Sequence, residues 1–359
     1  MEAALYDPGG GFFTGGGGAG RAGSDFITSP EVGALFGRLV ARWADSWWER
    51  LGEPDPYLMV DAGAGRGRLA RAVLDAAPRC SPALRYVLVE RSAALRHAQF
   101  EGLPVEPAEI ALGPAVAPEP DEAPEPVPGL GPVVTSLPDL PATPMTGVVV
   151  ANELLDNLPF RIVERADGGW LEIRVGERLA ECAVPADEAL AGEADALVAG
   201  LEVPTGARLP VQTAMREWLA DLGGVLHRGA VAVIDYAAAA GELAVRGQDG
   251  WLRTYRAQGR GAGVLERPGT QDITADVCLE ALRRSAARAG FRVAEETSQA
   301  GWLRSLGIEA LVDEARAAWH ARSASDLAAL RNRSLVHEAE ALTDVSGLGA
   351  HRVVILERP

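Results

Sequence analysis

The chain has 359 residues, 48% of them hydrophobic and 23% charged, which is typical of a globular protein and long enough for one large domain or two modest ones. Its formal net charge of −16 disfavours a nucleic-acid partner, and its three cysteines and five histidines lack metal-ligand spacing, so we expect no metal site. No apolar run reaches the roughly 18 residues of a membrane span and no secretory signal pattern is present, so we expect a cytoplasmic protein.

Short apolar segments alternate with helical patterns along the chain. A helix is expected near Thr28, because Thr28 and Glu31 have capping-box spacing and Pro30 suits an early helical position. Other helices are expected between Leu69 and Pro78, after Ser92, and over Met215–Leu226. The predicted strands are Tyr57–Ala62, Leu84–Val89, Gly147–Ala151, Ala230–Ile234, Phe291–Glu295 and Arg352–Leu356. This alternation predicts a doubly wound α/β sheet that is mostly parallel, with the last two strands as an antiparallel edge.

Three segments depart from the alternation. The first twenty residues are rich in glycine, which is typical of a flexible loop. Residues 114–132 are rich in Pro, Glu and Ala, which indicates a solvated insertion loop. Phe160–Val175 has the pattern of a hairpin that turns at Asp167–Gly169, and we assign it to an accessory region over about 157–212.

The most informative local motif is the glycine turn Asp61–Gly67, in which Gly63, Gly65 and Gly67 follow a strand and open a helix. Glycines at these places let the backbone turn sharply and approach a ligand closely, beyond the carboxyl ends of the strands. The spacing is GxGxG and not the GxGxxG of dinucleotide sites, which favours the methionine part of S-adenosylmethionine (SAM) over a pyrophosphate. The alternative is a turn that only packs helix on strand.

A carboxylate follows the next predicted strand. Glu90 stands about where a doubly wound domain places the acid that accepts hydrogen bonds from both ribose hydroxyls. Sites for NAD use the same placement, so Glu90 alone leaves an NAD-dependent oxidoreductase as an alternative. A solvated loop acid is the other alternative.

Two further strands end in polar residues. Asn152 and Glu153 follow the strand at Gly147–Ala151, and Asp235 follows the strand at Ala230–Ile234. An amide and carboxylates at this edge can orient an amine or a guanidinium and stabilise its positive charge. The alternatives are a polar helix start for the first pair and a turn acid for Asp235.

Several ordered blocks of the sequence together resemble the MidA family of SAM-dependent methyltransferases. These blocks are Leu5–Pro8 with Gly11–Phe13, Asp25–Glu31 with Phe36–Gly37, Gly63–Gly67, Val89–Ser92 with Leu95–Arg96 and Gln99, Ala151–Asp156 with Pro159, Asp235–Tyr236, Arg253 with Tyr255–Arg256, and Pro268–Thr274. The family includes a mitochondrial complex I assembly factor that acts as a protein arginine methyltransferase.

The resemblance implies a class I SAM-dependent methyltransferase fold with an N-terminal lid over 1–50 and a Rossmann-like domain over 51–359. It implies that Asp25, Thr28 and Glu31 form a wall of the site over the cofactor. Asn152 and Glu153 are expected to line the methyl-transfer site, with Tyr255–Thr274 packed nearby.

The sequence departs from the family pattern at several positions. Asp61 stands where the family usually has Glu, Phe12–Phe13 stand where it has two Tyr, and Ser24 and Ala237 stand where it has Gly. The His that commonly follows the Tyr-Arg pair is absent. These changes affect the expected substrate more than the expected cofactor.

We therefore expect methyl transfer from SAM to a nitrogen nucleophile, most specifically a protein arginine. SAM binding is assigned to Asp61, Gly63, Gly65, Gly67, Glu90, Asn152, Asp25 and Thr28, and catalysis to Glu153, Asn152, Glu31 and Asp235. The expected partner is a protein substrate, by resemblance a respiratory-complex subunit, and the oligomeric state stays open, a homodimer included. The alternatives are a small-molecule methyltransferase and a SAM-binding assembly protein without transfer activity.

Overall fold

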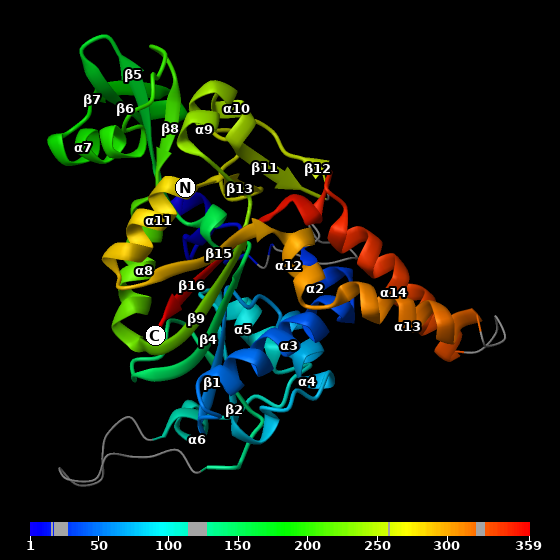
Figure 1. Ribbon diagram of the computed structural model, residues 1–359. Helices are drawn as coiled ribbons and strands as arrows, with labels where there is room; N and C mark the ends of the chain where they lie inside the picture. Colours follow the sequence, from blue (N-terminus) through cyan, green and yellow to red (C-terminus); the bar gives the residue numbers. More distant parts are fainter. Residues whose placement is uncertain (16, 18–27, 114–127, 258, 321–326) are drawn as a thin grey trace, which may run out of the picture. The chain divides into compact units, whose positions relative to one another are not determined.

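The computed structural model describes residues 1–15, 17, 28–113, 128–257, 259–320 and 327–359 (Figure 1). Asp25 and most of the insertion loop expected at 114–132 lie outside these residues. The chain divides into two compact units, each built from three separate stretches. The first unit comprises Met1–Phe26, Glu153–Gly224 and Asp235–Val293, and the second comprises Ile27–Asn152, Val225–Ile234 and Ala294–Pro359.

The second unit is built on a seven-stranded sheet. Its strands are β1 (Tyr57–Ala62), β2 (Leu84–Val89), β3 (Val133–Leu137), β4 (Met145–Asn152), β9 (Leu226–Asp235), β15 (Arg292–Ser298) and β16 (Arg352–Arg358). The order across the sheet is β15-β16-β9-β4-β1-β2-β3, and the pairs from β9 to β3 are parallel. The strand order reverses direction at β1 and β4, and open α/β sheets generally bind ligands at such a switch point.

The local patterns predicted these strands well. The predicted Tyr57–Ala62 and Leu84–Val89 coincide with β1 and β2, and both are buried along their whole length. Full burial is expected of parallel strands, whose two faces are both covered. The two C-terminal strands lie at one side of the sheet as predicted, with β16 inserted between β9 and β15. Their antiparallel direction stays a prediction.

The helices of this unit pack on its sheet or on one another. They are α2 (Ser29–Val32), α3 (Ala34–Arg50), α4 (Arg68–Asp75), α5 (Ala93–Gln99), α6 (Ala108–Leu112), α12 (Gln299–Ser305), α13 (Ile308–His320) and α14 (Leu327–Thr343). Ser92 caps α5 as predicted, since its side chain accepts a hydrogen bond from the Leu95 amide. The helix expected near Thr28 exists, but the predicted capping box is wrong, because Thr28 makes no side-chain cap bond. α2 ends at Val32, and Gly33 separates it from α3.

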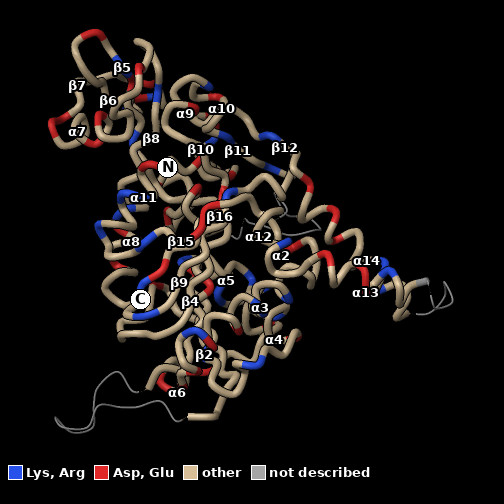
Figure 2. The backbone as a smooth tube through the Cα atoms, in the orientation of Figure 1, with Lys and Arg blue, Asp and Glu red and all other residues tan. Residues whose placement is uncertain are grey.

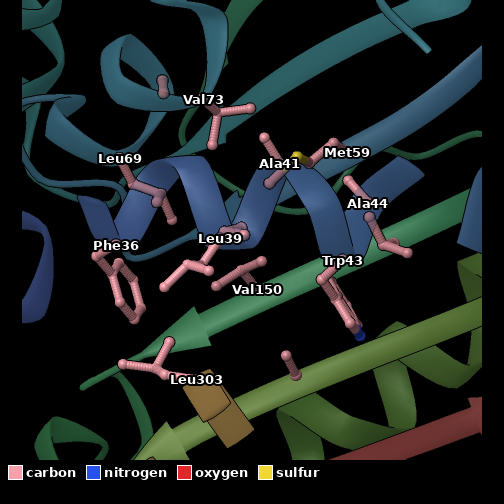
Figure 3. Close-up of a cluster of buried hydrophobic side chains, with 14 of the residues drawn as sticks. Phe36, Leu39, Ala41, Trp43, Ala44, Met59, Leu69, Val73, Val150 and Leu303 are labelled. Atoms are coloured by element: carbon pink, nitrogen blue, oxygen red, sulfur yellow. The ribbon is translucent and has the colours of Figure 1, made fainter. Parts of the chain in front are cut away.

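Apolar side chains of α3 pack on the sheet of the second unit (Figure 3). Phe36, Leu39 and Trp43 recur at helical spacing and are buried together with Val150 of β4. Trp43 also meets the Trp302 ring edge-on, with 6.0 Å between the ring centroids. Burial of large side chains stabilises by about 1.5–3 kcal/mol each, so this cluster holds α3 against the strands that carry the site.

Among the described residues, the first unit contains two antiparallel sheets, β7-β6-β5-β8 and β12-β11-β13, the short parallel pair β10-β14, and several helices. Its elements are α1 (Glu2–Tyr6), β5 (Arg161–Ala166), β6 (Gly169–Val175), β7 (Glu181–Pro185), α7 (Glu188–Leu197), β8 (Arg208–Val211), α8 (Thr213–Val225), β10 (Ala237–Ala238), α9 (Ala240–Arg246), α10 (Gln248–Trp251), β11 (Leu252–Arg256), β12 (Gly259–Arg260), β13 (Asp272–Ala275), β14 (Val277–Cys278) and α11 (Leu279–Arg288). The predicted hairpin is confirmed, because β5 and β6 pair antiparallel and join Ala166 to Gly169 across the turn.

The division into units differs from the boundaries assigned from the sequence. The segment 1–50 is divided between the two units, because Met1–Phe26 belongs to the first and α3 to the second. The accessory region of the first unit extends past 157–212 to Val293. Acidic and basic positions are interspersed along the chain (Figure 2). Among the described residues, none of the helices is both long and apolar enough to cross a membrane.

Candidate cofactor and methyl-transfer sites

The glycine turn after β1 lies in the second unit and has the backbone that only glycine adopts readily. The φ angles of Gly63, Gly65 and Gly67 are +77°, +53° and +77°. The amides of Gly63 and Ala64 both donate to the carbonyl oxygen of Val89, at 2.9 and 3.0 Å. The turn is therefore fixed to the carboxyl end of β2, beside Glu90.

The Glu90 carboxylate completes this connection. Its Oε2 accepts a hydrogen bond from the Gly65 amide at 2.9 Å, and its Oε1 accepts one from the Ser92 amide at 2.8 Å. Each carboxylate oxygen has a second lone pair for a further donor. The pKa of Glu90 is raised by burial, against which the two amide bonds act. The glycine turn and the acid thus belong to one site, with acceptor capacity left for a ribose.

Asp61, the fifth residue of β1, lies two residues before the first glycine of the turn. It is buried, and the Tyr86 hydroxyl donates to its Oδ2 at 3.3 Å. Burial raises the pKa of Asp61 to about 7, the Tyr86 bond opposes this rise, and the negative charge of Glu90 adds to it. A carboxyl that is half-protonated near neutrality is sensitive to a bound cation, and SAM carries a sulfonium and an amine.

We expect Asp61 to make the protein less stable as the pH rises from about 4 to about 7. Its folded-state pKa of about 7 lies above its ordinary 3.8, so between these values the folded chain holds a proton that the unfolded chain has lost. The free energy of unfolding should fall by a few kcal/mol across this window. Urea unfolding at several pH values checks this: Asp61→Asn should flatten the dependence, and the exposed Asp75→Asn should not. An unchanged slope in Asp61→Asn would contradict it.

Two polar residues to which we assigned no role from the sequence, Gln99 and Ser136, also support the turn by hydrogen bonds. The amide of Gln99, the last residue of α5, donates from Nε2 to the Gly65 carbonyl oxygen at 2.7 Å. The Ser136 hydroxyl of β3 donates to Gln99 Oε1 at 2.6 Å. Gln99 is fully buried, which is unusual for its residue type and marks it as part of the site's support. Its place in the resembling block Val89–Gln99 was the only signal in the sequence.

Glu31 lies on α2 and Thr28 directly precedes it, and α2 contacts α4, the helix that the glycine turn opens. Both are buried, and Glu31 Oε2 lies 3.4 Å from Nε of Arg68, the first residue of α4. The Glu31 amide donates to the Thr28 carbonyl oxygen at 2.9 Å. The structure therefore brings Glu31 next to the helix that the turn opens, the role of Thr28 stays a prediction, and Asp25 lies outside the described residues.

The predicted strand-end residues stand where the chain passes between the two units. Asn152 ends β4 and pairs in parallel register with Ile234 of β9. Glu153 and Asp235 are the next residues in each case and belong to the first unit. Glu153 has a φ of +51°, a left-handed backbone that is unusual for a residue with a side chain and is often found at functional sites.

Asp235 holds the loop that follows Glu153. Its Oδ2 accepts hydrogen bonds from the amides of Leu155 and Asp156 at 2.9 and 3.2 Å, and its Oδ1 accepts one from the Tyr236 amide at 2.9 Å. Asp235 is only 1% exposed. Three amide donors on one buried carboxylate favour a positioning role for Asp235 over direct contact with a substrate, which differs from the role assigned from the sequence.

Part of the segment Tyr255–Thr274, which was expected near the site, contacts the loop that follows Glu153. Asn157 Nδ2 donates to Asp272 Oδ1 and to the Ile273 carbonyl oxygen, both at 3.0 Å, so β13 contacts the loop that begins at Glu153. Asp156 is buried beside these residues. Burial, with the negative charges of Asp235 and Asp272, raises the pKa of Asp156 well above its usual range.

The residues around the turn fit the nucleoside cofactor that this fold binds. A Cβ placed on Gly65 would meet no atom within 4 Å, so the space in front of the turn is open, and Glu90 has acceptor capacity beside it. A parallel sheet with its switch point at β1 and β4, a glycine turn that opens a helix and an acid after the next strand are typical of a doubly wound domain that binds a nucleoside cofactor.

Comparison with known proteins gives the family. The model of the family described as "Putative S-adenosyl-L-methionine-dependent methyltransferase" matches residues 39–297, and the chain belongs to this family. The resemblance to the MidA family is confirmed, the fold is that of a class I methyltransferase, and SAM is the cofactor. The NAD-dependent oxidoreductase has no support in these findings.

Individual relatives and a solved structure are also similar to this chain. The chain is similar to the protein arginine methyltransferase NDUFAF7 of Rattus norvegicus, with 29% identity over 86% of this chain and 70% of the rat protein. It is also 32% identical to the Drosophila melanogaster homolog. That match covers 49% of this chain and only 40% of the fly protein's length. A solved Burkholderia thailandensis structure, bound to S-adenosyl-homocysteine, matches all of this chain and 86% of its own with a TM-score of 0.79 at 28% identity.

Proposed function

We propose that this methyltransferase acts on a nitrogen of a protein arginine. The observation that carries the proposal is the pair of acids at the ends of two strands. Glu153 directly follows β4 in a left-handed backbone, and Asp235, the last residue of β9, is bound by the amides of the loop after Glu153. The names of the relatives support the same substrate class, since they are called protein arginine methyltransferases.

The chemistry assigned to the residues is mainly binding and orientation. When bound, SAM would supply an electrophilic methyl group: its bond to sulfur would break as a bond to nitrogen forms, S-adenosyl-homocysteine would leave, and the nitrogen would lose one proton to water. Glu153 binds the guanidinium and localises its positive charge away from the attacking nitrogen. Asp235 fixes the loop behind Glu153. Bringing the two groups to near-attack distance and excluding water accounts for most of the acceleration in such transfers.

A labelling experiment tests this proposal. Purified chain with methyl-labelled SAM is added to a cell lysate, and the labelled proteins are hydrolysed to amino acids. We expect label in protein and in methylarginine. Label in a small-molecule fraction favours a small-molecule methyltransferase. No label, in a lysate where a related enzyme transfers methyl groups, favours a SAM-binding assembly protein.

The cellular setting is a further part of the proposal. The mammalian and fly relatives are named as mitochondrial proteins, and the resemblance suggests a respiratory-complex subunit as the methyl acceptor. For this chain the cytoplasm and such a subunit both stay predictions. Mass spectrometry of methylated arginines in respiratory subunits, from cells with and without this chain, checks the acceptor.

A further inference from the structure

A C-terminal helix caps the start of α3 within the second unit. Oε2 of Glu338, on α14, accepts a hydrogen bond from the Leu35 amide at 3.0 Å, across 303 residues of sequence. The Ser334 hydroxyl donates to the other oxygen, Oε1, at 3.0 Å. The first amides of a helix have no partner within the helix, and its positive N-terminal end favours an anion. Glu338 supplies the cap that the Gly33 position lacks.

The residue at the helix start leaves room for this carboxylate. A Cβ on Gly33 would lie 2.0 Å from Glu338 Cδ and 2.2 Å from its Oε2. The φ angle of Gly33 is 169°, an extended backbone that any residue can adopt. Glycine is therefore required at position 33 for space and not for conformation, and an alanine there should displace the carboxylate from the Leu35 amide.

A second buried contact ties the preceding helix to the same C-terminal elements. The hydroxyl of Ser29, the first residue of α2, donates to Gln299 Oε1 at 2.8 Å, and Gln299 Nε2 donates to the Leu342 carbonyl oxygen of α14 at 3.0 Å. Ser29 and Gln299 are fully buried. α2 is thus held at its start through Gln299, and just beyond its end through Glu338.

The helix held in this way carries the wall of the cofactor site. Glu31 of α2 lies 3.4 Å from Arg68, which directly follows Gly67 of the glycine turn. We infer that Glu338 is a positioning residue for SAM binding: by capping α3 it fixes Thr28 and Glu31 beside the glycine turn. The inference rests on the assignment of Thr28 and Glu31 to the cofactor site.

A double-mutant cycle read by SAM affinity tests the inference. Glu338→Ala removes the capping carboxylate, and Gly33→Ala displaces it with a methyl group from position 33. Each variant should bind SAM roughly tenfold more weakly, in the range that loss of a helix cap produces. The double variant Gly33→Ala/Glu338→Ala should bind no more weakly than Glu338→Ala, because the added methyl group then meets no carboxylate. Glu338→Gln, which keeps an acceptor oxygen but loses the charge, should lie between wild type and Glu338→Ala.

A matched control separates positioning from simple loss of stability. Val336→Ala, a buried change on the same helix, should lower Tm at least as much as Glu338→Ala and leave the SAM dissociation constant unchanged. The inference is overturned if both single variants bind SAM within twofold of wild type, or if their effects multiply. An unchanged affinity in Glu31→Gln would instead remove the assignment on which the inference rests. Wild-type methyl transfer to lysate proteins, measured separately, tests the proposed function and is independent of these results.

Discussion

We expect Glu90→Ala to bind SAM about a hundredfold more weakly than the wild-type chain. The variant loses the acceptor for the ribose hydroxyls and also leaves the amides of Gly65 and Ser92 without their partner. A hydrogen bond to a charged group contributes about 1.5–3 kcal/mol, so the loss of one ribose bond and a loosened turn accounts for this factor. Isothermal calorimetry with SAM measures it.

A second change at the same turn should agree with the first. Gly65→Val places a β-branched side chain at a φ of +53°, where such residues are strained, although the space in front of Gly65 is open. Its affinity for SAM should also fall. Glu101→Ala, an exposed acid outside the site, is the control and should bind as wild type does. If Glu90→Ala binds SAM within threefold of wild type, Glu90 has no role in holding the cofactor.

Glu153→Gln is expected to lower the rate of methyl transfer at least a hundredfold, with the SAM affinity retained. The amide keeps the size of the side chain but removes the charge that balances a guanidinium, and losing one preorganised electrostatic contact costs roughly a hundred- to a thousandfold. Because the loss arises in the transition state, it should appear in kcat and not in the SAM dissociation constant. Transfer of labelled methyl groups to lysate protein measures the rate.

The control for this change is Glu177→Gln, which removes an exposed acid of the same unit. It should transfer methyl groups at the wild-type rate. A Glu153→Gln variant that retains full transfer would contradict the role assigned to Glu153. A variant that loses SAM binding together with activity would place Glu153 in the cofactor site instead.

The strands and the glycine turn were predictable because their signals are local. Each of β1 and β2 is a short apolar run bounded by a turn, and Gly63–Gly67 require a backbone that few other residues adopt. The break at Gly33 was not predictable in this way. The spacing of Thr28 and Glu31 is that of a capping box, although no such cap forms. The cap of α3 comes from Glu338, which is remote in sequence.

The structure brings some of the predicted site residues together, and their roles stay predictions. Glu90 and the turn were assigned together, and they are joined by a hydrogen bond. We assigned no role to Gln99, because its hydrogen bond to Gly65 depends on how α5 packs against the turn, which no local pattern shows. Asp235 was taken for a substrate acid, since nothing local shows that three backbone amides occupy it.

A crystal structure of this chain with S-adenosyl-homocysteine tests the central claim most directly. We predict that the ribose hydroxyls bind Glu90 and that the amino-acid part lies against Gly63–Gly67. Ligand bound elsewhere, or ribose hydroxyls held by other residues while Glu90 remains on the Gly65 and Ser92 amides alone, would contradict the account.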